Sequence, residues 1–432
     1  MCIHFSSNVL NERELREKNV APTIDKVVDR FDDATPGVIQ SMKALLDHLG
    51  LFWRFFRKFR ELRQKKASPT IDEIVGGFED VSPEAKATMK ILLGFYVREN
   101  LPLNQQRPFR KFIRYVAKFN KSYKDEATAK RRFQNYLKNL EKIRKNRRHS
   151  RMYGLTQFSD LSEEEFRRGY GGLILDDMTK NLTRTINDSA HLRGGIENGT
   201  IITIPTHYDI RALKCTPPIK DQGGCGACWA FSSLAVTEIN HCLKTGQTYD
   251  LSEQEMISCT VTNATSPYVS HQCNGGSPYP ALDYIYQNGV TTADIFPYVG
   301  NDNLNNPAPC HQDGYRFRMV NKPHGSKNVI PEKVLPAYVY QNGAYSVAIC
   351  QDLLQNLKYQ GGIIMESHII PSDKCSQGQL DHAVTVVGYG HENGVNYWII
   401  LNSWGPDWGE AGYFRLQREK GLLNFKVFDY TY

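Results

Sequence analysis

The chain has 432 residues, enough for two or more domains, and its hydrophobic content of 41% is that of an ordinary globular protein. It contains no apolar run of the length that crosses a membrane as a helix. The net charge of +7 is unevenly shared, because residues 203–432 carry 15 Lys or Arg against 20 Asp or Glu, whereas residues 1–202 carry 38 against 26. Nucleic-acid binding is one interpretation of the basic part. An attraction between the two parts of the chain fits better, so we expect no nucleic-acid partner.

Residues 1–100 contain an internal repeat with an offset of 47 residues: the sequence PTID at residues 22–25 returns at residues 69–72. Thr70 and Glu73 can form a capping box, and Ser82-Pro83 can begin a second helix. Each copy therefore predicts a small helical hairpin that needs another surface for burial. The apolar residues at helical spacing are Ile24, Val27, Val28 and Phe31 in the first copy and Ile71, Ile74, Val75 and Phe78 in the second.

The stretch between the two copies is both basic and aromatic, with Phe or Trp at five of the nine positions 52–60. Such a segment can lie on an anionic membrane surface. A helix end packed within the hairpin is at least as good an interpretation.

Residues 107–172 have the pattern of an amphipathic helical hairpin, and residues 173–202 form a polar stretch with weak periodicity. Three N-x-[ST] glycosylation sequons, at Asn181, Asn187 and Asn198, crowd into this polar stretch, and Asn120 and Asn263 head two more. We expect a linker at residues 173–202 and a compact domain at residues 203–432.

Cys228 lies in the segment 222–231, QGGCGACWAF, and opens a run of helical periodicity that ends at Thr245-Gly246. At a helix N-terminus, unpaired backbone N–H groups and the helix dipole lower the pKa of a thiol and favour the nucleophilic thiolate. Taken alone, a cysteine on an apolar helix is better explained as a structural, buried residue.

Two downstream segments reverse that preference. His382 lies in an apolar, β-branched run that predicts a strand ending in a glycine turn at residues 388–390, and Asn402 follows a second strand pattern at residues 397–401. A cysteine protease needs a thiolate, an imidazole that exchanges protons with it, and a third group that holds the imidazole ring. It also needs donors for the oxyanion, for which the Gln222 amide and the Cys228 backbone N–H are candidates.

These segments resemble the papain-like cysteine proteases. Residues 225–229, CGACW, match the family's signature around its nucleophile, and residues 402–405, NSWG, followed by Trp408-Gly409 and Gly412-Tyr413, match its other motif. The resemblance covers residues 107–432 and implies an α+β fold of two parts. A helical half would carry Cys228, a β-barrel-like half would carry His382 and Asn402, and the active-site cleft would lie between them.

The resemblance also implies roles for individual residues in a cysteine-type endopeptidase that needs neither cofactor nor metal. Cys228 would be the nucleophile, His382 the general acid and base, Asn402 the group that orients the imidazole, and Gln222 an oxyanion donor, with Trp404 shielding the His–Asn hydrogen bond. A catalytically impaired homologue that acts as a binding or inhibitory scaffold is the alternative. The implied substrate-binding residues are Gly275 and Gly276 for the peptide backbone, and Pro278, Ala348, Leu380, Asp381 and Ala383 around an apolar specificity pocket.

Residues 107–172 resemble the inhibitory propeptides of the same family, nearest to the cathepsin F/L-like type. Arg132, Tyr136, Asn139 and Ile143 follow the spacing of its helical motif, and residues 153–161 resemble its second motif, although Thr128 and Arg147 depart from the first. The resemblance implies that this propeptide crosses the cleft in the non-productive direction until it is removed, with the mature enzyme beginning near Ile204. Because the propeptide region is basic and the peptidase region acidic, we also expect activation at acidic pH.

The ten cysteines indicate an oxidising compartment. The resemblance implies the disulfides Cys225–Cys273 and Cys259–Cys310. A third bridge from Cys375 is either absent or made with Cys215, Cys242 or Cys350. We therefore expect a lysosomal or secreted enzyme, although residues 1–10 lack the basic start and apolar core of a signal peptide, for which an incomplete N-terminus is the favoured explanation.

No family accounts for residues 1–100. Partner docking, targeting of the protease and added inhibition are possible functions for the repeats. A duplicated spacer is favoured because two repeats make a small core.

Overall fold

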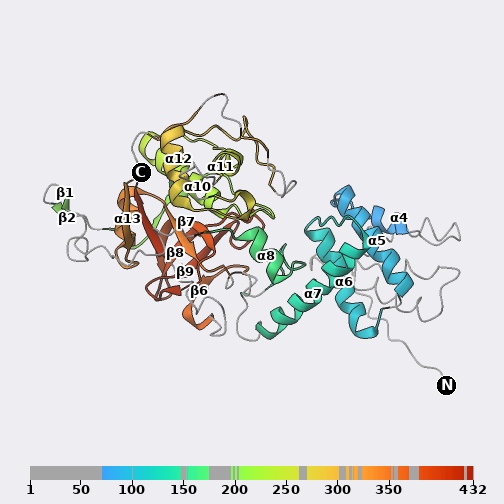
Figure 1. Ribbon diagram of the computed structural model, residues 1–432. Coiled ribbons are helices and arrows are strands. Elements are labelled where there is room, and N and C mark those ends of the chain that lie inside the picture. Colours follow the sequence, from blue (N-terminus) through green and yellow to red (C-terminus); the bar gives the residue numbers. More distant parts are fainter. Residues whose placement is uncertain are drawn as a thin grey trace, which may run out of the picture. The chain divides into compact units, whose positions relative to one another are not determined.

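The computed structural model describes residues 71–99, 101–146, 152, 154–174, 196–197, 200–201, 204–261, 270–300, 308–310, 314, 316–319, 324–351, 354, 359–368, 379–422 and 426–431. The first copy of the repeat and the aromatic stretch at residues 52–60 lie outside these residues. The chain divides into two compact units, residues 1–139 and 140–432, which are described separately below (Figure 1). In the described residues, no helix combines the length and the apolar character needed to cross a bilayer.

The first unit is helical and contains α4 (Ile71–Gly76), α5 (Pro83–Glu99), α6 (Leu103–Lys118) and most of α7 (Glu126–Asn146). Ser82 begins α5 as predicted, because its hydroxyl accepts a hydrogen bond from the Ala85 N–H at 3.2 Å. The core of this unit is aromatic. Its fully buried members on α6 and α7 are Phe109, Phe112, Phe133 and Tyr136.

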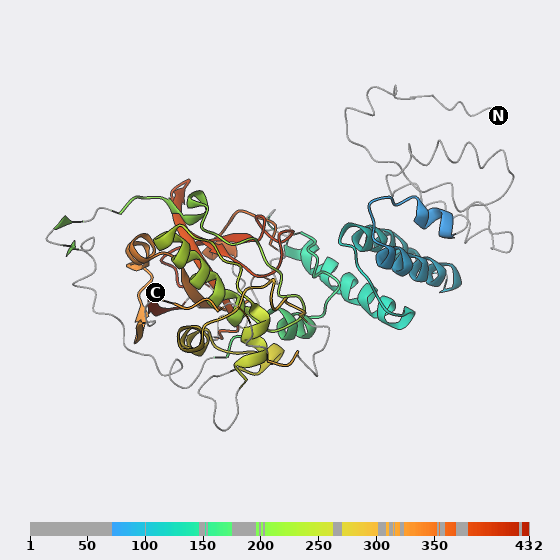
Figure 2. The ribbon, with the colours of Figure 1, turned by 90° about the horizontal axis from the view of Figure 1, so that it is seen from above.

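In the second unit, α10 (Cys228–Thr245) packs against the sheet and against two other helices. The predicted helix is confirmed at both ends: it begins at Cys228, and Gly246, at φ 73°, closes it with an N–H bond to the Cys242 carbonyl. Figures 1 and 2 both show α10 lying against the sheet, which it contacts through β7. The other helices are α8 (Glu163–Tyr170), α11 (Glu253–Cys259), α12 (Pro278–Asn288) and α13 (Leu335–Asn342), with short 3-10 turns η1 (Ile210–Leu213), η2 (Gln272–Asn274) and η3 (Glu366–His368).

The sheet of the second unit has eight strands in the order β4-β10-β5-β7-β8-β9-β6, with β3 paired to β7. All pairs are antiparallel except β6–β9. Two short strands, β1 (Ile196–Glu197) and β2 (Thr200–Ile201), form a separate pair. The bounds of the main sheet are β3 (Tyr208–Asp209), β4 (His324–Ile330), β5 (Tyr345–Ile349), β6 (Ile363–Ile364), β7 (His382–Glu392), β8 (Val395–Leu401), β9 (Tyr413–Gln417) and β10 (Lys426–Thr431).

The strand that begins at His382 does not end in a turn at residues 388–390, as the sequence suggested, but continues to Glu392. Gly388 instead allows the backbone of β3 to approach β7 closely. Because β3 pairs with β7 here, a Cβ at Gly388 would lie 2.4 Å from the Tyr208 carbonyl oxygen. The reversal follows at Asn393 and Gly394, both of which have positive φ. The second predicted strand does end where expected, since β8 stops at Leu401, one residue before Asn402.

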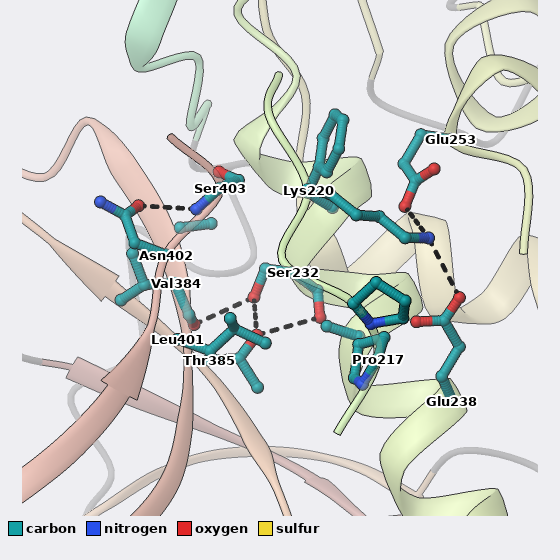
Figure 3. Close-up of a pocket in the computed structure, with 14 residues that line it drawn as sticks. Pro217, Lys220, Ser232, Glu238, Glu253, Val384, Thr385, Leu401, Asn402 and Ser403 are labelled. Carbon is teal, nitrogen blue, oxygen red and sulfur yellow. Dashed lines mark hydrogen bonds and ion pairs between the residues drawn. The ribbon is translucent and has the colours of Figure 1, made fainter. Parts of the chain in front are cut away.

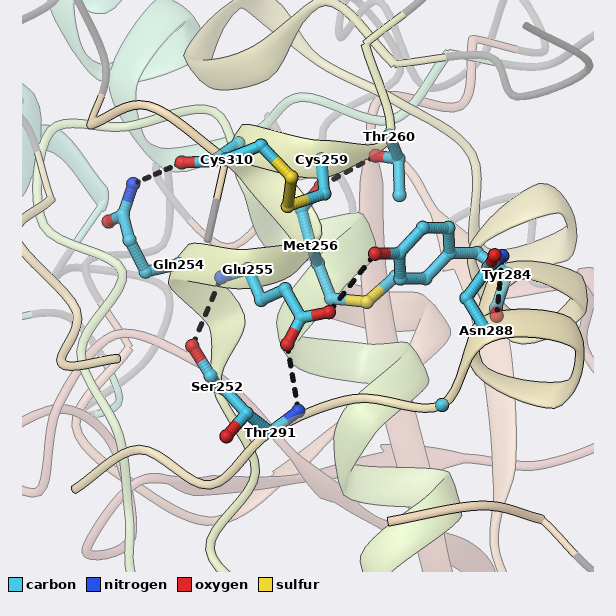
Figure 4. Close-up of a disulfide and its surroundings, with 12 residues drawn as sticks. Ser252, Gln254, Glu255, Met256, Cys259, Thr260, Tyr284, Asn288, Thr291 and Cys310 are labelled. Atoms are coloured by element: carbon cyan, nitrogen blue, oxygen red, sulfur yellow. Dashed lines mark hydrogen bonds between the residues drawn. A yellow bond between two sulfur atoms is a disulfide. The ribbon is translucent and has the colours of Figure 1, made fainter. Parts of the chain in front are cut away.

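Three disulfides join described residues. Cys225–Cys273 and Cys259–Cys310 are the pairs that the sequence resemblance implied (Figure 4). Cys215 pairs with Cys242, which removes both as partners of Cys375. Cys350 is also disulfide-bonded, and Cys375 lies outside the described residues.

The carboxylate of Glu255 on α11 is buried and links several segments of the helical half through hydrogen bonds (Figure 4). Its Oε1 accepts hydrogen bonds from the Tyr284 hydroxyl at 3.0 Å and the Arg316 guanidinium at 2.6 Å, and its Oε2 accepts one from the Thr291 N–H at 2.7 Å. Three donors from separate segments of the chain are thus satisfied by one side chain. Removing it would leave the Arg316 charge, which is only 17% exposed, without its counter-charge.

We predict that Glu255→Ala lowers the free energy of unfolding by about 3–5 kcal/mol, because it breaks a buried ion pair from one side. The matched control is Glu392→Ala, which removes the exposed partner of Arg415 at 2.7 Å and should cost less than about 1 kcal/mol. Denaturant unfolding of both variants in a Cys228→Ala background measures the difference. Equal losses would contradict the importance of the Glu255 network.

Candidate active site

Three segments bring Cys228, His382 and Asn402 together. Cys228 is the first residue of α10, His382 is the first residue of β7, and Asn402 follows the end of β8, the strand beside β7. The Cys228 sulfur accepts a hydrogen bond from the Ala383 N–H at 3.3 Å, so it lies directly against the residue after His382. All three side chains are buried.

The hydrogen bonds around Asn402 determine which nitrogen of His382 carries the proton. Asn402 Oδ1 lies 2.8 Å from His382 Nε2 and also accepts the Ser403 N–H at 2.9 Å. Because an amide oxygen only accepts, Nε2 must be the donor. His382 Nδ1 is then the free base, and it is buried with no hydrogen-bond partner among the described residues. A neutral imidazole held in this tautomer can take the proton of a neighbouring thiol.

Trp404 covers this arrangement. Its ring stacks on that of His382 with centroids 4.8 Å apart and 24° between the planes. Trp404 is itself fully buried and packs edge-on against Trp408, Phe158 and Phe166. The imidazole ring therefore has an aromatic face on one side, which keeps water from the His382–Asn402 hydrogen bond.

Gln222 is held by two residues that the sequence analysis did not identify. The Ser403 hydroxyl donates to Gln222 Oε1 at 2.6 Å, which leaves the Nε2 amide hydrogens to point at backbone carbonyls. The Tyr298 hydroxyl donates to the Gln222 main-chain carbonyl at 2.6 Å. Ser403 stands next to Asn402 in the same motif and was within reach of sequence reasoning. Tyr298, from a separate loop, carried no sequence signal.

Residues 169–174 lie against Gly226, two residues before Cys228, and against Asp381, the residue before His382. The Gly172 and Leu173 N–H groups donate to the Asp381 carbonyl at 3.1 and 3.2 Å. The Ile174 N–H donates to the Gly276 carbonyl and the Gly276 N–H donates to the Gly172 carbonyl, both at 2.8 Å, a parallel pairing. This approach requires glycine: Gly172 has φ 117°, and a Cβ there would lie 2.0 Å from the Gly226 carbonyl oxygen. The segment continues past residue 172, where the sequence placed its end.

Most of the expected substrate-binding residues lie near this segment. Ala348 of β5 and Ala383 of β7 are directly opposite each other in the sheet, and Leu173 is buried in the same apolar cluster, against which Leu380 packs. Pro278 begins α12 and is buried, and Gly275 and Gly276 follow η2. Asp381 accepts the Gln351 N–H at 2.8 Å through its carboxylate.

Burial beneath residues 169–174 sets the charge state of both reactive groups. It raises the pKa of the Cys228 thiol to about 12, an effect that the nearby Asp381 carboxylate reinforces. It lowers the pKa of His382 to about 4, although the hydrogen bond with Asn402 acts in the opposite direction. In the covered site, thiol and imidazole are therefore both neutral near pH 6. Burial in the covered site therefore opposes a thiolate–imidazolium pair.

The sequence profile described as "Papain family cysteine protease" matches residues 204–427. The chain therefore belongs to the papain family of cysteine proteases. A second profile, "Cathepsin propeptide inhibitor domain (I29)", matches residues 112–166. The protein is a cysteine protease zymogen with an α+β papain-like peptidase domain and an intramolecular inhibitory propeptide.

Similar proteins agree with this assignment. The "Viral cathepsin" of Autographa californica nuclear polyhedrosis virus is 35% identical over 310 residues, which cover 71% of this chain and 86% of that protein. "Oryzain gamma chain" of Oryza sativa subsp. japonica is 32% identical, covering 74% of this chain and 82% of that protein. Among solved structures, digestive procathepsin L2 of Tenebrio molitor has a TM-score of 0.59 and 27% identity, covering 75% of this chain and all of the other.

The papain-family domain also contains a buried charge cluster behind the catalytic residues (Figure 3). A cavity large enough for a water molecule lies between α10 and β7, and its lining includes Lys220, Glu238, Glu253 and Asn402. Lys220 lies 3.2 Å from Glu238 and 2.7 Å from Glu253, and both carboxylates are almost fully buried. In the described residues, no three His, Cys, Asp or Glu side chains converge as a metal site.

One lysine cannot fully compensate two buried carboxylates. Burial raises the pKa of Glu238 to about 8, despite the attraction of Lys220, and it raises the pKa of Glu253 as well. An unfolded glutamate has a pKa near 4.5. Between these two values the folded protein binds a proton at Glu238 that the unfolded chain has lost, so the contribution of Glu238 to stability falls as pH rises from 4.5 to 8.

We predict that Glu238→Gln, which keeps the side chain neutral at every pH, flattens this dependence. The thermal unfolding midpoint of a Cys228→Ala chain should fall between pH 4.5 and 8 relative to that of the same chain with the added Glu238→Gln substitution, because the other titrating groups, His382 among them, are common to both. The exposed Glu366→Gln serves as the control, with the same chemical change and no expected effect. An unchanged pH profile in Glu238→Gln would show that another group is responsible.

Proposed function

We propose that Cys228, His382, Asn402 and Gln222 carry out peptide-bond hydrolysis through an acyl-enzyme. The observation that supports these roles most directly is the position of the Cys228 sulfur, 3.3 Å from the Ala383 N–H, while the adjacent His382 keeps Nδ1 unpaired. His382 takes the proton of the Cys228 thiol, and the thiolate attacks the scissile carbonyl carbon. Gln222 Nε2 and the Cys228 N–H stabilise the resulting oxyanion.

The same groups complete the reaction. The carbonyl re-forms as the C–N bond breaks, and the His382 imidazolium gives its proton to the leaving amine. His382 then removes a proton from water, which attacks the thioester and releases the carboxylate and the free thiol. No observation favours the scaffold alternative, since all four groups are present. Asn402 holds His382, Ser403 holds Gln222, and the Cys228 sulfur accepts the Ala383 N–H.

The pro-segment blocks this chemistry in two ways. It occupies the backbone sites at Gly276 and Asp381 in a parallel direction, and it keeps Cys228 and His382 neutral by excluding water. A low pH favours release of the pro-segment from the active site. An exposed imidazole takes up a proton below about pH 6.5, whereas the covered one does so only near pH 4, so lowering the pH through this range stabilises the uncovered state.

We predict that an epoxide thiol reagent labels Cys228 of the full-length chain slowly at pH 7 and faster as the pH falls to about 4, in line with the His382 pKa of about 4 in the covered site. Labelling is measured on the uncleaved chain by intact mass, and Cys228→Ala gives the background. Peptidase activity after removal of residues 1–203 is measured in parallel. Absence of both labelling and activity would refute the proposed function.

We also propose that the pocket formed by Ala348, Ala383, Leu380 and Pro278 selects an apolar side chain. Its occupant in the zymogen is apolar, since Leu173 is only 8% exposed and clusters with the two alanines. Burying a leucine side chain contributes about 1.5–3 kcal/mol. An endopeptidase substrate with leucine at this position should therefore exceed one with a charged residue by roughly 10- to 100-fold in kcat/KM.

We predict that Ala348→Leu, which fills the pocket, lowers kcat/KM for the leucine substrate and favours a substrate with alanine at the same position. The control is Ala337→Leu on α13, a half-buried residue away from the residues that hold Leu173. Peptides that differ only at this position measure the ratio. An unchanged ratio in Ala348→Leu would place the pocket elsewhere.

We propose a lysosomal or secreted location. Three disulfides between described residues favour an oxidising compartment. Cleavage in the linker, residues 173–202, would release a peptidase domain beginning near Ile204. Mass spectrometry of the mature enzyme would locate this new N-terminus.

A further inference from the structure

Helix α5 belongs to the second copy of the repeat, yet it packs against the propeptide helix α6. The inhibitor profile begins at residue 112, so α4 and α5 lie outside it. Nevertheless α5 is buried along one whole face. The buried residues are Ala85, Thr88, Met89, Leu92, Leu93, Phe95 and Tyr96.

Aromatic rings join α5 to α6 and α7. Tyr96 stacks on Phe109 of α6 with centroids 4.9 Å apart, and Phe95 lies 6.3 Å from the same ring. Phe109 in turn packs edge-on against Phe133 of α7 at 5.2 Å. Phe109 is fully buried, and its contacts with Tyr96 and Phe95 account for part of that burial. One continuous aromatic cluster thus spans all three helices.

Polar contacts fix the same interface in register. The Thr88 hydroxyl accepts the Tyr123 N–H at 2.8 Å, a buried hydrogen bond to the connection between α6 and α7. Asn120 Oδ1, from the same connection, accepts the Ser82 N–H at 3.0 Å. Arg98 pairs with Glu126 at the start of α7. A spacer needs no buried hydrogen bond of this kind, since losing one costs free energy only where the partner is hidden from water.

We propose that α4 and α5 form a working part of the inhibitor, which stabilises the α6–α7 hairpin and so slows the opening of the cleft. This inference rests on the proposed function. Two features connect the hairpin to the cleft. Helix α7 continues without a break to Asn146, and its Lys142 forms an ion pair with Glu163 at the start of α8. Residues 169–174, which cover Cys228, begin within the last turn of α8.

The binding surface is therefore the face of α6 and α7 that carries Phe109 and the Tyr123 amide, and its partner is the second repeat of the same chain. The chemistry is aromatic and aliphatic at the centre. Charged contacts lie at the edge, where Lys130 sits 4.5 Å above the Phe95 ring and 3.3 Å from Glu99. Such an arrangement, apolar inside and charged outside, is typical of a specific interface.

Two variants of the full-length chain test the proposal. Tyr96→Ala removes the stacked ring, and Thr88→Val removes the hydroxyl while keeping the shape of the side chain. Ala87→Val, on the adjacent exposed position, is the control for Thr88→Val because both place a β-branched residue in the same turn. Lys90→Ala, also exposed, is the control for Tyr96→Ala.

The first measurement is hydrogen exchange of the α6 and α7 amides in a Cys228→Ala background. Exchange should rise about tenfold or more in Tyr96→Ala and by less in Thr88→Val, with the controls unchanged. The second is the rate of epoxide labelling at Cys228 of the uncleaved chain at pH 5, which should rise in the same order. If Tyr96→Ala fails to fold, Thr88→Val carries the test.

The outcomes are distinct. Faster exchange together with faster labelling supports the proposal. Unchanged exchange overturns it, because α5 then does not support the hairpin. Faster exchange with unchanged labelling also overturns it, because the hairpin is then stabilised without effect on the cleft. If the isolated peptidase domain neither reacts with the epoxide nor cleaves peptides, the proposed function itself fails, and this inference falls with it.

Discussion

The structure of the peptidase unit depends on one junction, the contact between the first turns of α10 and the start of β7. The nucleophile candidate comes from the helix and the imidazole from the strand, so neither has a function unless the two halves hold a fixed register. The hydrogen bond from the Ala383 N–H to the Cys228 sulfur joins the helix to the strand at this point. One turn further along α10, the Ser232 hydroxyl donates to the Val384 carbonyl at 2.9 Å (Figure 3). It also lies 2.7 Å from the Ser346 hydroxyl.

These hydrogen bonds are buried, so they stabilise the junction only in the correct arrangement. A hydroxyl that loses its partners inside a protein costs about 1–3 kcal/mol, which penalises any sliding of helix against strand. A purely apolar interface would tolerate such a shift more easily. The polar contacts of Ser232 with β5 and β7 therefore contribute positional accuracy, which catalysis requires, as much as stability.

Sequence reasoning succeeded where a residue's role follows from its own segment. The helix that begins at Cys228 and ends at Gly246 has apolar periodicity and a glycine stop, and both features were visible in the sequence. It failed where the role depends on a contact far away in the chain. Tyr298 holds the Gln222 carbonyl from 76 residues away, and nothing near Tyr298 indicates this. Gly388 looked like a turn because the approach of β3, which explains it, is a tertiary contact.

The N-terminal repeat also shows that sequence reasoning predicts an element more readily than its tertiary contacts. In the second copy, the one that the structure describes, its pattern correctly predicted helices with an apolar face. A pattern cannot say what covers that face, and so a spacer was favoured. Thr88 of α5 accepts a buried hydrogen bond from the Tyr123 N–H of the propeptide hairpin, and a spacer does not explain a buried polar contact of this kind. The inhibitor of this enzyme then controls Cys228 by two additive means. Local exclusion of water keeps the thiol neutral, and the stability of a helical unit sets how often that exclusion is lifted.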